Sequence, residues 1–181
     1  MKRIILTLAL SLALAASAVA QGAHHIISGT ITKVDAAAKT VTIKTKDGAE
    51  MVVSETGKAI RQGAQAAKVG GQAVIEYTEE GGKKIVESVK YVAAGTVHET
   101  KGVVTAIDRG AKTITIKTAS GAEEVYSVAE DGVVTAGKAT GHAGVQSWDA
   151  VAGATKKGTE VTVYSTEVAG KKVAHAIAHV F

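Results

Sequence analysis

The fold of this chain is decided by a seven-residue stretch that occurs twice, first as Lys39-Thr40-Val41-Thr42-Ile43-Lys44-Thr45 and then as Lys112-Thr113-Ile114-Thr115-Ile116-Lys117-Thr118. Polar and apolar residues alternate along both copies, which is typical of a β-strand with one buried face and one face in water. Each copy is followed by a Gly-Ala-Glu sequence, at residues 48–50 and 121–123. Glycine readily adopts a positive φ, so the sequence predicts a hairpin turn after each of the two strands.

The repetition extends well beyond these strands. Residues 29–54 align with residues 102–127 at a constant offset of 73, and 15 of the 26 aligned pairs are identical. A second similarity relates residues 71–92 to residues 158–180, with Tyr77 matching Tyr164. Because a solenoid normally needs three or more repeats, we expect two similar modules, at residues 21–94 and 95–181.

Each module is predicted to be all-β and to contain five strands. The expected strands are residues 26–35, 39–46, 49–54, 72–78 and 83–92 in the first module, and residues 99–108, 112–119, 122–128, 159–166 and 171–180 in the second. Good helix formers at residues 59–68 predict a short helix, and another is expected near residues 145–152. This order favours two tandem OB-like five-stranded barrels, each with a short helix or loop between strands three and four; a plain antiparallel sandwich is the alternative. Gly29 and Gly102 interrupt the first strands, where we expect a bulge or bend.

The first 20 residues have the pattern of a secretory signal peptide. Lys2 and Arg3 precede an apolar run over residues 4–15, and residues 18–20 form a small-x-small cleavage site. Removal of residues 1–20 leaves 161 of the 181 residues (181 − 20) and no second apolar run of membrane-spanning length. We therefore expect a periplasmic or secreted protein that has no membrane span after cleavage.

The composition excludes several classes of function. The chain contains no cysteine, which excludes a disulfide framework, a thiolate metal site and a cysteine nucleophile. After loss of the two basic residues of the leader, 19 basic residues (21 − 2) face 17 acidic ones, a balance that attracts nucleic acid only weakly. The polar face of the second strand carries no aromatic ring on which a base could stack, so a nucleic-acid partner is not expected. The sequence also lacks a Gly-x-Ser-x-Gly nucleophile elbow, and we do not expect an enzyme.

The spacing of glycines and core positions resembles a bacterial family of exported domains of unknown function. The matching pattern is Gly29-x-Ile31-x-x-Val34-Asp35, then Thr40-Val41-Thr42-Ile43, then Gly71-x-x-Val74-x-x-Tyr77, and the second copy carries equivalent residues. This family consists of short β modules that often occur in tandem, so the resemblance implies a fold and export but transfers no active site. More weakly, the chain is similar to periplasmic copper and silver chaperones, small OB-like barrels in which Met and His ligands and a neighbouring Trp line one face.

Histidines are the candidate metal ligands, because imidazole suits copper and zinc. His24 and His25 are adjacent near the expected new N-terminus. His175 and His179 lie four residues apart in a predicted strand, roughly 13 Å from each other, which is too far for these two alone to hold one ion. A site that also used His142 would have to be assembled by folding. The counterparts of His175 and His179 in the first repeat are a glutamate and a tyrosine, so we interpret both positions as a solvent face, with Cu or Zn binding as the alternative to a protein without a cofactor.

The connection between strands three and four is the clearest difference between the modules. It spans residues 55–70 in the first module and residues 129–157 in the second, where it carries His142 and Trp148, the only tryptophan. Long irregular segments are often binding loops, so His142 and Trp148 are candidate ligand contacts; alternatively, Trp148 caps the barrel. The sequence thus predicts a non-catalytic binding or cell-envelope module whose partner is an unidentified envelope protein or glycan.

Overall fold

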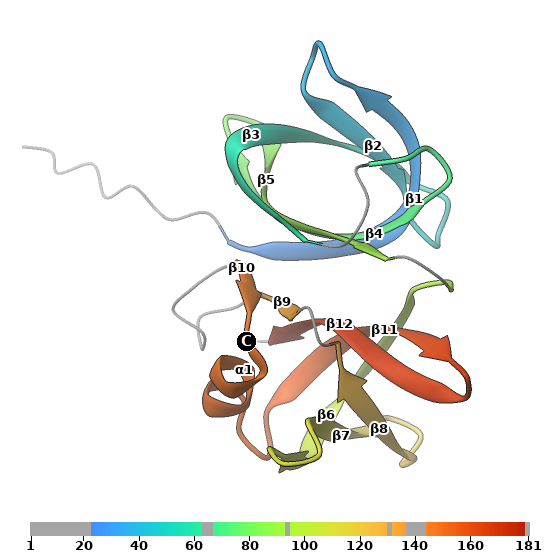
Figure 1. Ribbon diagram of the computed structural model, residues 1–181, viewed down its shortest axis with the longest axis vertical. Helices are drawn as coiled ribbons and strands as arrows, with labels where there is room; N and C mark the ends of the chain where they lie inside the picture. Colours follow the sequence, from blue (N-terminus) through green and yellow to red (C-terminus); the bar gives the residue numbers. More distant parts are fainter. Residues whose placement is uncertain (1–22, 63–66, 93–94, 130–131, 137–143, 180–181) are drawn as a thin grey trace, which may run out of the picture.

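The computed structural model describes residues 23–62, 67–92, 95–129, 132–136 and 144–179. Most of them belong to β-strands, and the chain forms two β modules, drawn one above the other in Figure 1. The strands of the first module end at Val92, and those of the second begin at His98. The expectation of an all-β chain built from two tandem OB-like modules is confirmed.

The first module is a closed barrel. Its five strands are β1 (His25–Asp35), β2 (Thr40–Lys44), β3 (Glu50–Gln62), β4 (Gln72–Glu80) and β5 (Lys83–Val92). They follow one another around the barrel in the order β1-β2-β3-β5-β4, and β4 pairs with β1 to close the ring. Only the β3–β5 pair is parallel, which is the arrangement of an OB-like Greek-key barrel.

The second module repeats this ring and extends it. The ring consists of β6 (His98–Asp108), β7 (Thr113–Thr118), β8 (Glu123–Val128), β11 (Glu160–Val168) and β12 (Lys171–His179). The β12–β8 and β11–β6 pairs close it in the same order as the first barrel. Two short strands that the sequence did not predict, β9 (Val133–Ala136) and β10 (Gly144–Gln146), continue the sheet beyond β12.

The helix expected at residues 59–68 is not found in the described part of that segment. Instead, β3 continues to Gln62, and Ile60, Arg61 and Gln62 pair in parallel with β5. The helix-forming residues of the segment express only a weak local preference. The backbone hydrogen bonds that β5 offers override that preference. The end of β3 therefore forms part of the barrel wall in place of a helix.

The helix expected near residues 145–152 does exist, slightly later in the chain. It is α1 (Trp148–Ala154), and the hydroxyl of Ser147 caps it by accepting a hydrogen bond from the Ala150 amide at 3.4 Å. Trp148, Val151 and Ala152 are buried against the core of the second barrel. α1 therefore closes one end of this barrel.

The first strand of each barrel pairs with two neighbours along its length. In β1, residues 25–30 pair with β4 and residues 30–35 pair with β2. A Cβ added at Gly29 would lie 2.2 Å from the carbonyl oxygen of Lys44, and one added at Gly102 would lie 2.7 Å from that of Lys117. The register shifts lie three residues beyond these glycines, at positions 32 and 105. The first strand thus changes partners next to the glycine, and the bulge itself lies three residues later. Glycine is needed at 29 and 102 because another strand passes too close for a side chain.

A shared apolar cluster joins the two barrels. The hydroxyl of Tyr164 donates a hydrogen bond to the Ile26 carbonyl of the first barrel at 3.1 Å, and burial raises the pKa of Tyr164. Because each barrel contributes side chains to the cluster, the two modules pack as one body. The buried members are Val74, Val92, Val97, Val134, Tyr164 and Ala176.

Candidate functional site

The outward-facing residues of strands two and three form matching surfaces on the two barrels. We call this surface the outer face. It consists of three cross-strand pairs, Thr40–Ser54, Thr42–Val52 and Lys44–Glu50 in the first module and Thr113–Ser127, Thr115–Val125 and Lys117–Glu123 in the second. Residues paired directly across two strands have their side chains in contact on one side of the sheet. Each outer face therefore presents hydroxyl groups, one valine and one pair of opposite charges.

All six residues of the outer face are identical in the two modules, whereas the inner face behind them has changed. At the four inner positions only Ile43 and Ile116 are the same residue; the others pair Val41 with Ile114, Met51 with Glu124 and Val53 with Tyr126. Surface substitutions usually change stability very little, whereas core substitutions are costly. Drift after a duplication should therefore alter the outer face first. The opposite is observed, which indicates a constraint on the outer face other than folding.

In the first module the outer face borders a groove of about 550 Å³. The β1–β2 turn contributes Ala38, the β4–β5 turn contributes Gly82, and the first residue of β5 contributes Lys83. Val52 is 56% exposed beside the groove, and its counterpart Val125 is 55% exposed. In OB folds this face and these two loops are where oligomeric ligands bind. The alignment of the two repeats already pointed to this face. Along the third strand, the residues that are identical in the two repeats are the alternate ones, which face outward.

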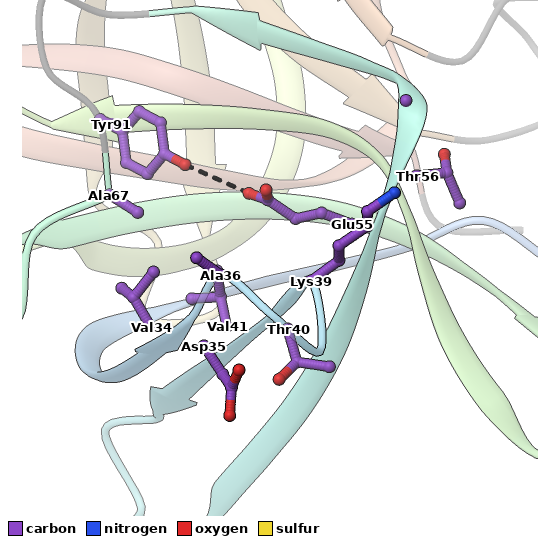
Figure 2. Close-up of a pocket in the computed structure, with 11 residues that line it drawn as sticks. Val34, Asp35, Ala36, Lys39, Thr40, Val41, Glu55, Thr56, Ala67 and Tyr91 are labelled. Atoms are coloured by element: carbon purple, nitrogen blue, oxygen red, sulfur yellow. Dashed lines mark hydrogen bonds between the residues drawn. The ribbon is translucent and has the colours of Figure 1, made fainter.

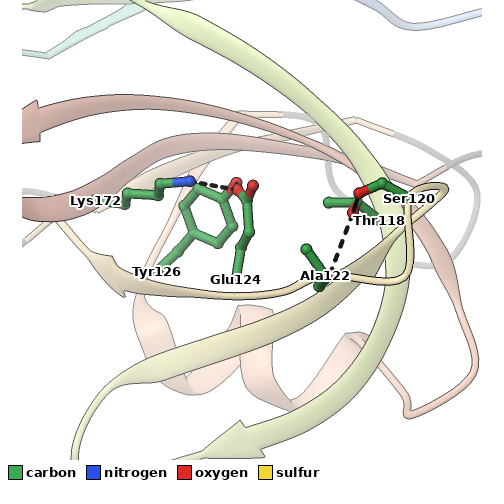
Figure 3. A network of polar contacts seen from close by, with 6 residues as sticks. All are labelled: Thr118, Ser120, Ala122, Glu124, Tyr126 and Lys172. Carbon is green, nitrogen blue, oxygen red and sulfur yellow. Dashed lines mark hydrogen bonds and ion pairs between the residues drawn. The ribbon is translucent and has the colours of Figure 1, made fainter.

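A polar network lies behind the outer face of the second module, as Figure 3 shows. Lys172 Nζ lies 2.6 Å from Glu124 Oε2, and the hydroxyl of Tyr126 donates to the same oxygen. The hydrogen bond from Lys172 and that from Tyr126 lower the pKa of Glu124. Burial, followed by the bond to Glu124, raises the pKa of Tyr126 to about 12. The network links β8 to β12 in the barrel wall. The Glu124 carboxylate therefore bonds to groups of the protein itself.

The far end of the first barrel contains an open pocket of about 400 Å³, shown in Figure 2. The hydroxyl of Tyr91 donates to Glu55 Oε1 at 3.4 Å across this pocket. At its rim, Asp35 accepts a hydrogen bond from the Ala38 amide at 2.9 Å, and this bond lowers the pKa of Asp35. The lining residues are Val34, Asp35, Ala36, Lys39, Thr40, Val41, Glu55, Thr56, Gly57, Ala67 and Tyr91.

Trp148 occupies the corresponding end of the second barrel. Its side chain is buried among the core residues of this barrel, and its indole Nε1 donates to the Arg109 carbonyl at 3.2 Å. The Arg109 guanidinium in turn donates to the Ala152 carbonyl of α1 at 3.2 Å. In this structure Trp148 thus closes the barrel; its role as a ligand contact stays a prediction. His142, the other candidate in this connection, lies outside the described residues.

The remaining histidines contact protein groups at separate places. His24 Nδ1 lies 3.1 Å from Glu76 Oε1, and the ring of His25 stacks on Tyr77 with 5.3 Å between ring centroids. His175 Nε2 lies 2.9 Å from the Thr166 hydroxyl, and His179 Nε2 lies 3.0 Å from that of Thr155. Over the described part of the chain, no three His, Asp or Glu side chains gather closely enough to hold a metal ion. A site for Cu or Zn would therefore need another arrangement of His24, His25, His142, His175 and His179.

The interpretation of positions 175 and 179 as a solvent face was wrong for His179, which is buried, whereas His175 is half-buried. His179 is only 5% exposed. The register between β11 and β12 shifts at His175, because Tyr164 pairs with Ala176 and Ser165 with Ala174, and such a bulge reverses which residues of the strand point inward. Beyond it, His179 faces the end of α1 through Thr155. The same shift occurs in β5 at Glu87, which accepts a hydrogen bond from Thr78 at 3.1 Å.

Two buried charged residues that the sequence analysis did not single out lie where the barrels meet. Glu76 is fully buried, accepts a hydrogen bond from Ser88 at 2.8 Å, and has its pKa raised by burial. Lys90 is 1% exposed and donates to the Gly132 carbonyl of the second module. Along their strands, both residues lie between apolar neighbours. In sequence, this alternation looks the same as that of a residue on a solvent-exposed face.

No family model and no curated protein matches the chain. Among solved structures, the chain is similar to silver-bound CusF from Escherichia coli, with a TM-score of 0.36 and 16% identity, covering 40% of this chain and 96% of that one. Apo-CusF from the same organism gives a TM-score of 0.36 and 15% identity, with 42% and 96% covered. The CSD456 segment of Drosophila Unr gives a TM-score of 0.33 and 9% identity, with 87% and 62% covered. These similarities assign the chain to no family.

Within the described ranges, no helix has the length and apolar character needed to cross a membrane. The expected signal peptide, residues 1–20, lies outside these ranges.

Proposed function

We propose that the chain is an exported, non-catalytic binding protein that presents one polar face twice. The observation that carries this proposal is the outer face, whose six residues are the same in both modules although the inner face has diverged. A requirement to contact the same ligand on both barrels accounts for this pattern. Stability alone accounts for it poorly, because cross-strand pairs on a wet face contribute only about 0.2–1 kcal/mol each.

The chemistry of the outer face suits a repetitive, hydroxyl-rich partner such as an envelope glycan. Threonine and serine hydroxyls both donate and accept hydrogen bonds, and the exposed valine offers a small apolar contact between them. None of the six residues is aromatic, so base stacking, which single-stranded nucleic acids require, is not provided. A polymer with repeating units would engage both faces at once, and such linkage strengthens binding without any new kind of contact.

Export and the absence of catalysis belong to the same proposal. Export is supported by the signal-peptide pattern of residues 1–20. An exported protein would contact an envelope glycan in the periplasm or outside the cell. The non-catalytic role is supported by the position of the most deeply buried charges. Glu76 and Lys90 are buried, Lys90 donates to the Gly132 carbonyl of the second module, and neither residue lines the groove beside Val52.

The proposal is tested by placing a charge at the centre of each outer face. We expect wild-type mature protein to cosediment with purified peptidoglycan sacculi. Val52→Glu or Val125→Glu alone should weaken this binding on the order of a hundredfold, because one of two linked contacts is lost. The double variant should remain in the supernatant. Cosedimentation followed over a range of protein concentrations measures these differences.

The matched control is Val69→Glu, which changes a valine that is 67% exposed and outside the groove. Its binding should equal that of the wild type. Thermal unfolding of all variants should agree within about 1 kcal/mol, since exposed substitutions in strands have effects of this size or less. Wild-type protein that does not bind sacculi, or a double variant that binds them normally, would contradict the proposal of a glycan ligand.

The alternative proposal is a periplasmic carrier of Cu or Zn that acts through its histidines. The observation that favours it is the adjacency of His24 and His25 at the start of β1. Calorimetric titration of the mature protein with Cu(II) and Zn(II) decides between the two proposals. A binding protein for glycans is expected to give no heat at micromolar metal, whereas a carrier gives a saturable signal that the double change His24→Ala, His25→Ala removes.

A further inference from the structure

Among the described residues, one end of the first barrel is open, and it corresponds to the end that α1 fills in the second barrel. Pocket residues Val34, Val41 and Glu55 align at the offset of 73 with Ile107, Ile114 and Val128. All three of those counterparts pack in the cluster that contains Trp148. The counterpart of Tyr91 is His179, which bonds to Thr155 at the end of α1.

The turn at the rim of this pocket has the same conformation in both barrels. Asp35 accepts a hydrogen bond from the Ala38 amide at 2.9 Å, just as Asp108 accepts one from Ala111 at 2.8 Å. The lysine that ends each turn, at positions 39 and 112, has the same left-handed φ of 53°. The carbonyl of Ala36 therefore occupies the place of the Arg109 carbonyl, which accepts the indole N–H of Trp148 in the second barrel.

The walls of the pocket match an aromatic ring with a polar N–H. Val34, Val41 and Ala67 supply aliphatic contacts, and Tyr91 supplies an aromatic one. Val34 is 40% exposed, whereas its counterpart Ile107 packs in the Trp148 cluster. The volume of about 400 Å³ lies within the range of small-ligand pockets, which are mostly apolar and carry a few polar groups that fix orientation.

We propose that the open end of the first barrel is a binding site for an indole ring, whose N–H donates to the Ala36 carbonyl while the ring packs on Val34 and Val41. This site shares only Thr40 with the outer face, and it does not depend on the glycan proposal. The indole can come from a free small molecule or from a tryptophan side chain of a polypeptide. Three probes distinguish these sources: indole itself, N-acetyltryptophanamide, and a synthetic peptide with the sequence of residues 147–155, which carries Trp148.

Amide chemical shifts of the ¹⁵N-labelled mature protein report where each probe binds. Addition of indole should shift the signals of residues 34–41 and 55–57 saturably and leave those of α1 unchanged. N-methylindole, which has no N–H, should bind about tenfold more weakly because it loses one hydrogen bond. Indole binding without binding of the other two probes identifies a small molecule as the ligand; binding of the amide and the peptide identifies a polypeptide.

Ala67→Phe fills the pocket and should abolish the shifts, whereas Ala49→Phe, at an exposed turn residue outside the pocket, should not. The outer-face double variant, Val52→Glu with Val125→Glu, should bind indole as the wild type does, so failure of one proposal is distinguishable from failure of the other. The inference is overturned if none of the three probes shifts residues 34–41, if the shifts persist in Ala67→Phe, or if N-methylindole binds as well as indole.

Discussion

Trp148→Ala is expected to lower the free energy of unfolding of the second barrel by about 3–5 kcal/mol, the range observed when large aromatic residues are removed from cores. Trp148 is 8% exposed and packs with Val151 and Ile114. Its loss leaves a cavity at the end of the barrel and also leaves the Arg109 carbonyl without its indole partner. Urea unfolding followed by far-UV circular dichroism measures the change without relying on tryptophan fluorescence.

Trp148→Phe is the matched control for this experiment. It retains an aromatic ring in the core but loses the hydrogen bond, whose net contribution to stability is about 0.5–1.5 kcal/mol. Its cost should therefore be clearly smaller than that of Trp148→Ala. If both variants unfold at the wild-type urea concentration, Trp148 does not close the end of the second barrel.

Gly29→Ala should destabilise the first barrel by about 3 kcal/mol or more, which is at the upper end of overpacking effects. The new Cβ would lie 2.2 Å from the Lys44 carbonyl, and this neighbour is backbone that cannot rotate away. β1 and β2 would have to separate at the point where β1 changes partners. Gly102→Ala should have a smaller effect, because the corresponding distance to Lys117 is 2.7 Å.

Gly57→Ala provides the control in the same barrel. No atom lies within 4 Å of a Cβ added there, and Gly57 does not have a positive φ. The substitution should be neutral or should stabilise by up to about 1 kcal/mol, because alanine reduces the freedom of the unfolded chain. Thermal unfolding of the three variants gives the ranking. Equal melting temperatures for Gly29→Ala and Gly57→Ala would show that β1 and β2 leave room for a side chain at position 29.

Part of the candidate site was accessible from the sequence. The alternation in residues 39–45 and 112–118 identified which residues of the second strands face outward, and Gly48 and Gly121 marked the hairpins that the structure confirms with φ values of 86°. The alignment of the two repeats also showed that the outward-facing residues are the same in both. The groove beside Val52 required the structure, since its other wall comes from the β4–β5 turn at Gly82.

By itself the sequence determined the duplication, the strand positions and the turns, because alternation and glycine placement are local properties that act within a few residues. Tertiary structure alone decided that β3 continues to Gln62 in place of a helix, that α1 closes only one barrel among the described residues, and that Glu76 and Lys90 are buried. In each case the deciding contact comes from a segment distant in the chain: β5 offers hydrogen bonds to β3, and the second barrel covers the first. Local patterns cannot report such contacts, since a residue facing outward from its own barrel looks the same in sequence whether water or another barrel lies beyond it.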